Sequence, residues 1–316
     1  MKKLFFISLL FTFIALIALV YFVIPDKIVV RRTASLNAKQ NAVFRSVTDH
    51  KNWGKWWPVA NTNKENLNNN SYNLNRVQFS LVDILTSSII IDIKTKKNTL
   101  KSSLDFLSFA RDSILLTWNT ELATTFNPVK RVQNYLIALE VKNDLDILLK
   151  KMQAYYSKVE NTYGILIEEI PVVDSTLIFI SDSSHGYPTS KFIYTLIDQL
   201  KNYSIKQGAQ QSGFPMLNVY TIDSISYLVK VALPVNKKLK DEGLIKYKWM
   251  LGGGKILVCD ITGENNKINY GLKQLEYYLR DYNRVAPAIP FISLITDRLK
   301  EPDSTKWKSR IYYPVM

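Results

Sequence analysis

The stretch GGGKILVCDITGENNKINYGLKQLEYYLRDY, residues 252–282, decides how the second half of this 316-residue chain is organised. It begins with three glycines and an apolar run, KILVCDIT, whose β-branched residues are typical of a buried strand. After a Gly-led turn, Leu272, Leu275, Tyr278 and Leu279 recur at the three- and four-residue spacing of an amphipathic helix. The stretch therefore predicts a strand followed by a helix that packs on it.

The same pattern occurs earlier in the chain. From Gly186 the sequence GYPTSKFIYTLIDQL predicts a turn and a second amphipathic helix with the apolar face Phe192, Leu196, Ile197 and Leu200. In both copies a loop with an X-Pro pair, a strand, and a final strand ending in Pro-Val follow. A strand precedes each copy, GILIEEIPVV (164–173) before the first and GGGKILVCDIT before the second. Such a repeat predicts a pseudo-twofold domain of two strand-helix-strand-strand halves.

The preceding region, residues 26–160, has a different order of elements. KIVVRRTASLNA predicts a strand, and a short helix follows that Ser35 or Asn37 can cap. The Asn-rich segment 61–75 predicts a loop, and several strand-like runs come next, the last of them RVQNYLIALEV (131–141). Leu and Tyr at helical spacing in residues 143–161 then predict a long closing helix.

Three of the six tryptophans fall within HKNWGKWWP, residues 50–58. A tryptophan ring buries roughly 150–250 Å² and dominates local packing. The rings therefore either pack a corner after the first helix and border a cavity, or form a platform for a ligand, or contact a membrane interface.

The N-terminus, residues 1–25, is predicted to be a membrane anchor. Residues 4–24 carry no charge, and a helix of that length can cross a hydrocarbon core of about 30 Å. The alternative is a cleaved signal peptide, but the run is longer than an ordinary signal region and lacks small residues at its end. Lys2 and Lys3 favour a cytoplasmic N-terminus in a single-pass protein of a bacterial inner membrane, with the soluble part outside, whereas Lys27, Arg31 and Arg32 oppose that orientation.

Composition limits the chemistry that the chain can perform. The formal net charge is +14, yet the basic residues are spread out and no nucleic-acid-binding motif accompanies them, so no nucleic-acid partner is predicted. With one cysteine, Cys259, and two histidines, the sequence predicts no metal site, no cofactor and no catalytic residue. The cluster SDSSHGYP (181–188) is interpreted as a turn, because a catalytic triad draws its members from separated elements.

Residues 26–160 resemble the SRPBCC superfamily, also described as START-like or polyketide-cyclase-like. The resemblance is carried by AKQNAVFRSVTDHKNWGKWWP, by ILLTWNTELATTFNPVKR and by the closing helix. It implies a helix-grip fold, in which a curved antiparallel sheet grips a long helix around a cavity that often holds an apolar ligand.

Residues 161–316 resemble the GyrI-like domain, also called the AraC-type or bacterial transcription activator effector-binding domain. The resemblance is carried by GGGKILVCDITG, GLKQLEYYLRDY, PFISLITD (290–297) and WKSRIYYPV. It implies a groove between two halves that receives small, often planar or cationic, molecules. Members of the family usually have a glutamate and a tyrosine where this chain has Ile292 and Leu294, so cation binding is in doubt and an apolar or neutral ligand is favoured.

The sequence therefore predicts an α+β protein with one transmembrane helix, a helix-grip domain and a GyrI-like domain. We expect non-catalytic binding of a small, apolar or neutral molecule, or of a protein partner. A hydrolase or cyclase acting in one of the cavities is the alternative, together with a degenerate interaction scaffold. The ligand-binding residues predicted are Trp53, Trp57, Trp118, Tyr220, Trp249, Tyr278, Ile292 and Leu294.

Overall fold

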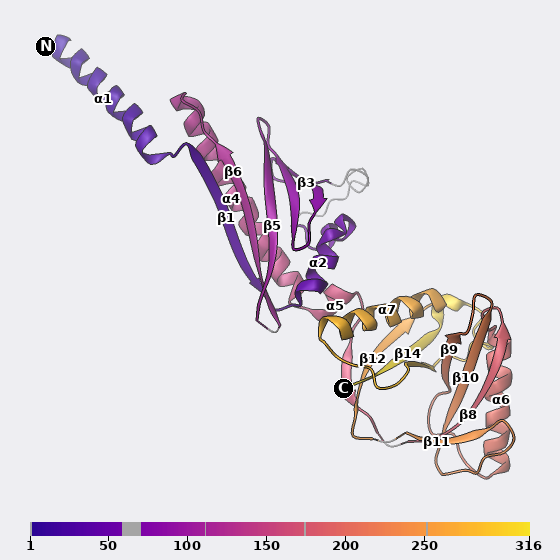
Figure 1. Cartoon of the computed structure of the whole chain (residues 1–316). Helices are drawn as coiled ribbons and strands as arrows, with labels where there is room; N and C mark the ends of the chain where they lie inside the picture. Colours follow the sequence, from indigo (N-terminus) through magenta and orange to yellow (C-terminus); the bar gives the residue numbers. More distant parts are fainter. Residues whose placement is uncertain (1, 59–70, 111, 174, 251) are drawn as a thin grey trace. The chain divides into compact units, whose positions relative to one another are not determined.

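A computed structural model describes residues 2–58, 71–110, 112–173, 175–250 and 252–316, and the chain divides into two compact units, residues 1–162 and 163–316 (Figure 1). The first unit contains a six-stranded sheet and the second an eight-stranded one, and both sheets are antiparallel throughout. The α+β class expected from the sequence is confirmed.

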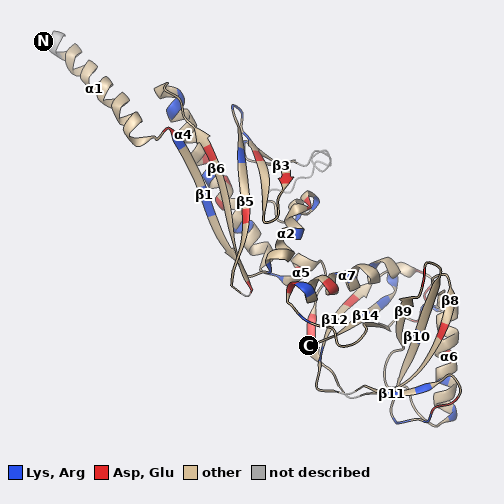
Figure 2. Cartoon of the chain, in the orientation of Figure 1, with Lys and Arg blue, Asp and Glu red and all other residues tan. Residues whose placement is uncertain are grey.

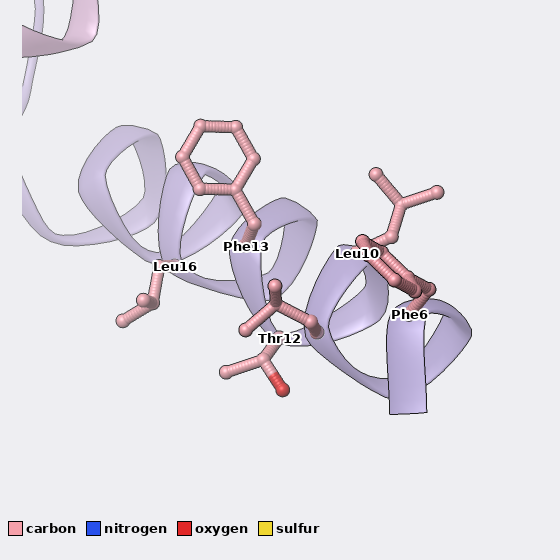
Figure 3. Close-up of a pocket in the computed structure, with 6 residues that line it drawn as sticks. Phe6, Leu10, Thr12, Phe13 and Leu16 are labelled. Carbon is pink, nitrogen blue, oxygen red and sulfur yellow. The ribbon is translucent and has the colours of Figure 1, made fainter. Parts of the chain in front are cut away.

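The chain begins with helix α1, Lys2–Val23. Its segment Phe5–Val23 is uncharged and strongly hydrophobic, and it is long and apolar enough to cross a membrane, either as an anchor or as a signal sequence. Figure 3 shows a depression between Phe6, Leu10, Phe13 and Leu16 on this helix. Because α1 alone lines it, the depression is a notch in the helix surface rather than a binding site.

After α1, the described residues of the first unit form one sheet, the long helix α4 and three short helical elements, α2, η1 and α5. The sheet order is β1-β6-β5-β4-β3-β2. The elements are β1 (Lys27–Leu36), α2 (Gln40–Thr48), η1 (His50–Lys55), β2 (Ser71–Leu74), β3 (Val77–Ile84), β4 (Ser88–Lys94), β5 (Thr99–Ala110), β6 (Ser113–Ala123), α4 (Pro128–Tyr156) and α5 (Val159–Tyr163).

Three local predictions for this unit were wrong. Ser35 lies within β1, and Lys39 occupies the N-cap position of α2 without a side-chain cap, so neither Ser35 nor Asn37 caps the helix. Residues 71–74 of the Asn-rich segment form β2 rather than a loop, and 61–70 lie outside the described residues. Residues 131–141 are helical, not a strand, because Asn127 caps α4 and Pro128 starts it.

Helix α4 packs along the sheet through one apolar face. Ala138, Val141, Leu145 and Leu148 follow one another at three- and four-residue spacing and are all buried. The helix contacts β1 most extensively, and a bidentate ion pair reinforces that contact: Arg32 Nε and Nη2 donate to the Asp146 carboxylate at 2.6 and 2.5 Å. Sheet and helix are thus joined by an apolar core and by one charged clamp.

The Arg32–Asp146 pair predicts a specific acid sensitivity. The hydrogen bond from Arg32 lowers the pKa of Asp146 below its ordinary value, so the pair stabilises the fold above about pH 4 and loses that contribution as the pH falls through the lowered pKa. Both side chains are one-third exposed, so the contribution is at most about 1 kcal/mol. We expect Asp146→Asn to destabilise the protein at pH 7 and to have progressively less effect as the pH falls below about 4, measured by denaturant unfolding. A difference that stays constant with pH would contradict the assignment.

The second unit has the strand order β11-β8-β10-β9-β13-β14-β12-β7. Read from each edge toward the centre, it is the same arrangement twice, with α6 following β8 and α7 following β12. The elements are β7 (Glu168–Pro171), β8 (Ser175–His185), α6 (Ser190–Lys206), β9 (Met216–Thr221), β10 (Ser226–Val235), β11 (Lys246–Met250), β12 (Lys255–Thr262), α7 (Asn265–Asp281), β13 (Phe291–Leu294), η2 (Ser304–Lys306) and β14 (Lys308–Val315).

Two boundaries differ from those predicted. The first half begins with β8, whereas the predicted strand at residues 164–173 supplies β7, which pairs with β12 of the other half. The segment 181–185, expected in a turn, forms the end of β8 because it pairs with β10 over its whole length. Ser181 and His185 therefore belong to a regular strand.

The two faces of this sheet differ in character. One register row, Ile180–Val231–Leu217–Ile292–Ile311–Cys259, runs across six strands, and all six side chains are buried. This row lies on the helix side, since a Cβ at Gly271 of α7 would lie 2.8 Å from Ile311 Cδ1. Side chains alternate along a strand, so the neighbouring row, Phe179–Ala232–Met216–Ser293–Arg310–Asp260, lies on the opposite, helix-free face.

Candidate functional site

The helix-free face of the second unit carries a cavity of about 600 Å³, which we call the groove. Its floor is made of β8, β9 and β10, where Phe179, Ala232 and Met216 occupy one cross-strand row. Ala232 lies between two larger side chains, so the floor is lowest at its position. This volume falls within the range of about 300–1,000 Å³ that is usual for small-molecule sites.

The walls of the groove come from three other segments. Residues 287–289 and Phe291 form one wall, and Asn218 Nδ2 ties that wall to the floor by donating to Pro290 O at 2.8 Å. Trp249 and Met250 at the end of β11 form another. The first residues of β12 and the last residues of β14 complete the lining. Segments far apart in sequence thus enclose one space.

The lining is apolar except for Asn218 and three lysines, Lys230, Lys248 and Lys255. The described residues that line the groove include no Asp, Glu, His or Cys. Lys255 Nζ lies 2.5 Å from the Glu169 carboxylate, which Arg284 also contacts at 2.8 Å. These two donors hold the pKa of the Glu169 carboxyl below its ordinary value, so Glu169 stays ionised and is shared between two cations.

Lys230 and Lys248 have no such compensation. Within the described part of the chain, no carboxylate lies at ion-pair distance from either ammonium group. Lys230 projects from the floor, two residues from Ala232 on the same face of β10, and is half-buried. Lys248 lies on the edge strand β11 and is exposed.

Three other carboxylates of this unit, those of Asp260, Glu264 and Glu168, lie outside the groove. Asp260 accepts hydrogen bonds from Arg310 Nε and Nη2 at 2.5 and 2.7 Å, and this pairing lowers its pKa. Glu264 is the N-cap residue of α7 and accepts from Ser304 Oγ. Glu168 lies on the edge strand β7, opposite Val258 of β12. None of the three lines the groove.

Ile292 and Leu294 were expected in the groove, but their side chains lie on the other face of the sheet, which packs against the helices. Ile292 pairs with Ile311 and Leu217 in the helix-side row, and Leu294 shares that side because the two are separated by one residue. Phe291, one position earlier, lines the groove and stacks on Tyr312 with ring centroids 4.9 Å apart. Ile292 and Leu294 therefore do not line the groove, and a ligand-binding role for them stays a prediction.

The other predicted residues of this unit lie in three different places. Trp249 lines the groove and is 57% exposed. Tyr220 is on the groove face of β9 by alternation from Asn218, but it lies outside the lining and is 63% exposed. Tyr278 lies on α7, where it stacks on Tyr282 and contacts Tyr163. Only Trp249 is therefore placed to touch a ligand in the groove.

The three tryptophans predicted for the first unit lie in its core. Trp53 and Trp118 have no exposed surface, and Trp57 is 6% exposed. Trp53 stacks on Trp57 with ring planes 5° apart, and both rings contact Tyr72. Each ring nitrogen has an acceptor: Trp53 Nε1 donates to Val47 O, Trp57 Nε1 to Asn73 O, and Trp118 Nε1 to Ser102 Oγ. This geometry is that of packed core, and a ligand-binding role for these rings stays a prediction.

The remaining chemically distinctive groups do not form a site. Burial raises the pKa of the Cys259 thiol to about 12, so this cysteine is an inert core residue. Among the described residues, no three His, Cys, Asp or Glu side chains lie close enough together to hold a metal ion. Lys and Arg are distributed over both units (Figure 2), in keeping with the dispersed pattern in the sequence.

Comparison with known proteins gives likeness in fold alone. No family model and no curated protein matches the chain. The crystal structure of the EcmrR C-terminal domain is 15% identical with a TM-score of 0.42 and covers 48% of this chain and 98% of that one. The crystal structure of a hydrolase from Listeria innocua is 12% identical with a TM-score of 0.36, and the match covers 48% of this chain and 91% of that one. The structure of SAV2435 bound to tetraphenylphosphonium is 13% identical with a TM-score of 0.31, and the match covers 48% of this chain and 94% of that one. Likeness at this level carries no conclusion on function.

Most of the residues that line the groove carry no local sequence signal for that role. Phe179, Met216, Lys230 and Ala232 lie on strands that were expected, but their common face follows only from the strand register. An alternation count along β10, in which Val229, Val231 and Leu233 are buried, would have assigned Lys230 and Ala232 to the other face.

Proposed function

We propose that the chain is a membrane-anchored protein that binds a small molecule, without chemical conversion, in the groove of its second, GyrI-like unit. The observation that carries the proposal is the groove itself: a space of about 600 Å³ with an apolar floor on the face of the sheet opposite the described helices α6 and α7 of the same unit. Burial of apolar ligand surface there supplies roughly 25 cal/mol per Å².

Non-covalent binding is favoured over catalysis by the composition of the lining. General acid–base or nucleophilic catalysis needs a carboxylate, imidazole, thiol, hydroxyl or activated amine beside the substrate, and a lysine amine is activated by desolvation or by a second cation nearby. Of the groove lysines, Lys248 is exposed and Lys255 is ion-paired with Glu169, which disfavours such activation at both. The described lining residues offer lysine amines and one amide, and Asn218 already donates to Pro290 O. A site of this kind recognises a ligand by shape and charge.

The proposal of an uncleaved anchor is supported by the junction after α1. Ile24 is buried in the core of the first unit. Arg131, itself buried, donates from Nε to Ile24 O at 2.8 Å, pairs with Asp26 at 2.7 Å and lies over the Tyr21 ring. A cation that donates a hydrogen bond to a carbonyl at a helix C-terminus also interacts favourably with the helix dipole. A signal sequence leaves its protein and has no reason to be docked in this way.

Native mass spectrometry of the full chain, purified gently from membranes, tests the proposal. We expect a reproducible extra mass that disappears on denaturation, because a filled apolar groove releases its ligand slowly. The extra mass should be absent from Ala232→Trp, in which an indole fills the floor, and present in Leu228→Trp, on the same face of β10 but outside the lining. An extra mass that survives in Ala232→Trp is bound outside the groove and would count against the proposal.

A further inference from the structure

We infer that the ligand of the groove is an amphipathic anion, an apolar body that bears one carboxylate or phosphate group, with Lys230 as the residue that selects its charge. The inference rests on the proposed function, because it specifies the ligand class of the same groove. Three observations carry it: the charge of the lining, the position of Lys230, and the distance between the groove lysines.

The groove carries positive charge that is compensated at Lys255 but not at Lys230 or Lys248. Three lysines line it, no described lining side chain is acidic, and the nearby Glu169 is divided between Lys255 and Arg284. A concave site with walls of low polarity focuses such a charge and concentrates counter-ions of opposite sign. A cationic ligand would meet uncompensated repulsion, whereas an anion would complete the set of charges.

Lys230 is the cation best placed to contact a bound head group. It projects from the floor beside Ala232 and is half-buried, so water screens it less than the exposed Lys248. Its strand neighbours on the same face, Asn218 and Ser181, offer amide and hydroxyl groups rather than carboxylates. An anion at Lys230 thus has a charge partner and neutral polar neighbours.

The lysines lie at the ends of an apolar strip. Lys230 pairs with Ser181 and Lys248 pairs with Leu177 on the shared strand β8, with Phe179 on the same face between them. Four residues along a strand span about 13 Å, so the two ammonium groups start from well-separated positions. The strip between them suits an apolar body longer than a single ring, and one head group can reach only one of the two lysines.

Quenching of Trp249 fluorescence by brominated probes tests the inference on the full chain in phosphatidylcholine nanodiscs. Bromine quenches a tryptophan only on contact, and Trp249 lines the groove, so the Trp249→Phe variant gives the background from the other five tryptophans. The probes are 9,10-dibromostearate as the anion, its methyl ester as the neutral analogue, and the matching dibrominated alkyltrimethylammonium as the cation.

We expect dibromostearate to bind most tightly, and Lys230→Gln to weaken it by about tenfold while leaving the methyl ester unchanged. Lys248→Gln should weaken it less, because that lysine is exposed. The matched control is Lys191→Gln/Lys267→Gln, which removes two exposed lysines of α6 and α7 without touching the groove.

Each other outcome has a defined meaning. Equal affinity for anion and ester, or tightest binding of the cation, would overturn the inference and leave the proposed function standing. No quenching of Trp249 by any probe would overturn both. Nanodiscs made with dibrominated phosphatidylglycerol, compared with dibrominated phosphatidylcholine, separate the two sources: quenching by the bilayer's own anionic lipid indicates a membrane ligand, and quenching by added dibromostearate alone indicates a free one.

Discussion

Trp53→Ala is expected to lower the free energy of unfolding of the first unit by about 3–5 kcal/mol, the usual cost of deleting a fully buried large aromatic side chain. Trp53 has no exposed surface, and its ring contacts Trp56, Trp57 and Tyr72 at centroid distances of 5.7–5.8 Å. The change also removes the donor to Val47 O, so a buried carbonyl loses its partner. Denaturant unfolding, followed by circular dichroism, measures the loss.

Trp249→Ala is the matched comparison, because it removes the same side chain from an exposed position in the other unit. We expect its effect on stability to stay within about 0.5 kcal/mol, whereas it should weaken dibromostearate binding, measured by titration calorimetry because the variant lacks the indole that reports quenching. The pair separates the roles left open for the tryptophans of residues 50–58. If Trp53 were part of a ligand platform, Trp53→Ala would abolish binding with little loss of stability, and the core assignment would fail.

The order of elements could be predicted from the sequence where a strong period existed. The repeated strand-helix-strand-strand pattern in residues 163–316 appears in the sheet as two matching halves around β9 and β13, because amphipathic helices and X-Pro strand entries are local signals. The prediction of a strand at residues 131–141 was wrong because this segment has no strong period. A short run rich in Val, Leu and Ile fits both a strand and a helix, and only the cap at Asn127 and Pro128 decides in favour of α4.

Most of the residues that line the groove could not be predicted, because the face on which a strand side chain lies depends on strand register. A shift of one position moves every side chain of a strand to the other face. In residues 290–297 that single step separates Ile292, which faces the helices, from Phe291, which lines the groove. The charge of the groove likewise arises from three lysines on three different strands, which no spacing along the chain brings together.

Ala232→Trp is expected to weaken ligand binding in the groove by roughly 60-fold. The residue is small and lies between Phe179 and Met216 in the floor, so a larger side chain there projects into the space that the ligand occupies. If the indole displaces about 100 Å² of ligand contact, the loss at about 25 cal/mol per Å² is about 2.5 kcal/mol. Tryptophan is well tolerated in strands, and this face carries no helix that the ring would strike.

Two measurements on this variant separate a filled groove from a damaged fold. Dibromostearate affinity should fall while the unfolding transition of the second unit stays near that of the unmodified chain, and Leu228→Trp should change neither. Because the ring removes apolar contact and leaves Lys230 in place, it should weaken the anion and its methyl ester by the same factor, whereas Lys230→Gln weakens the anion alone. If Ala232→Trp binds both probes as tightly as the original chain, the ligand lies elsewhere and the groove is not the functional site.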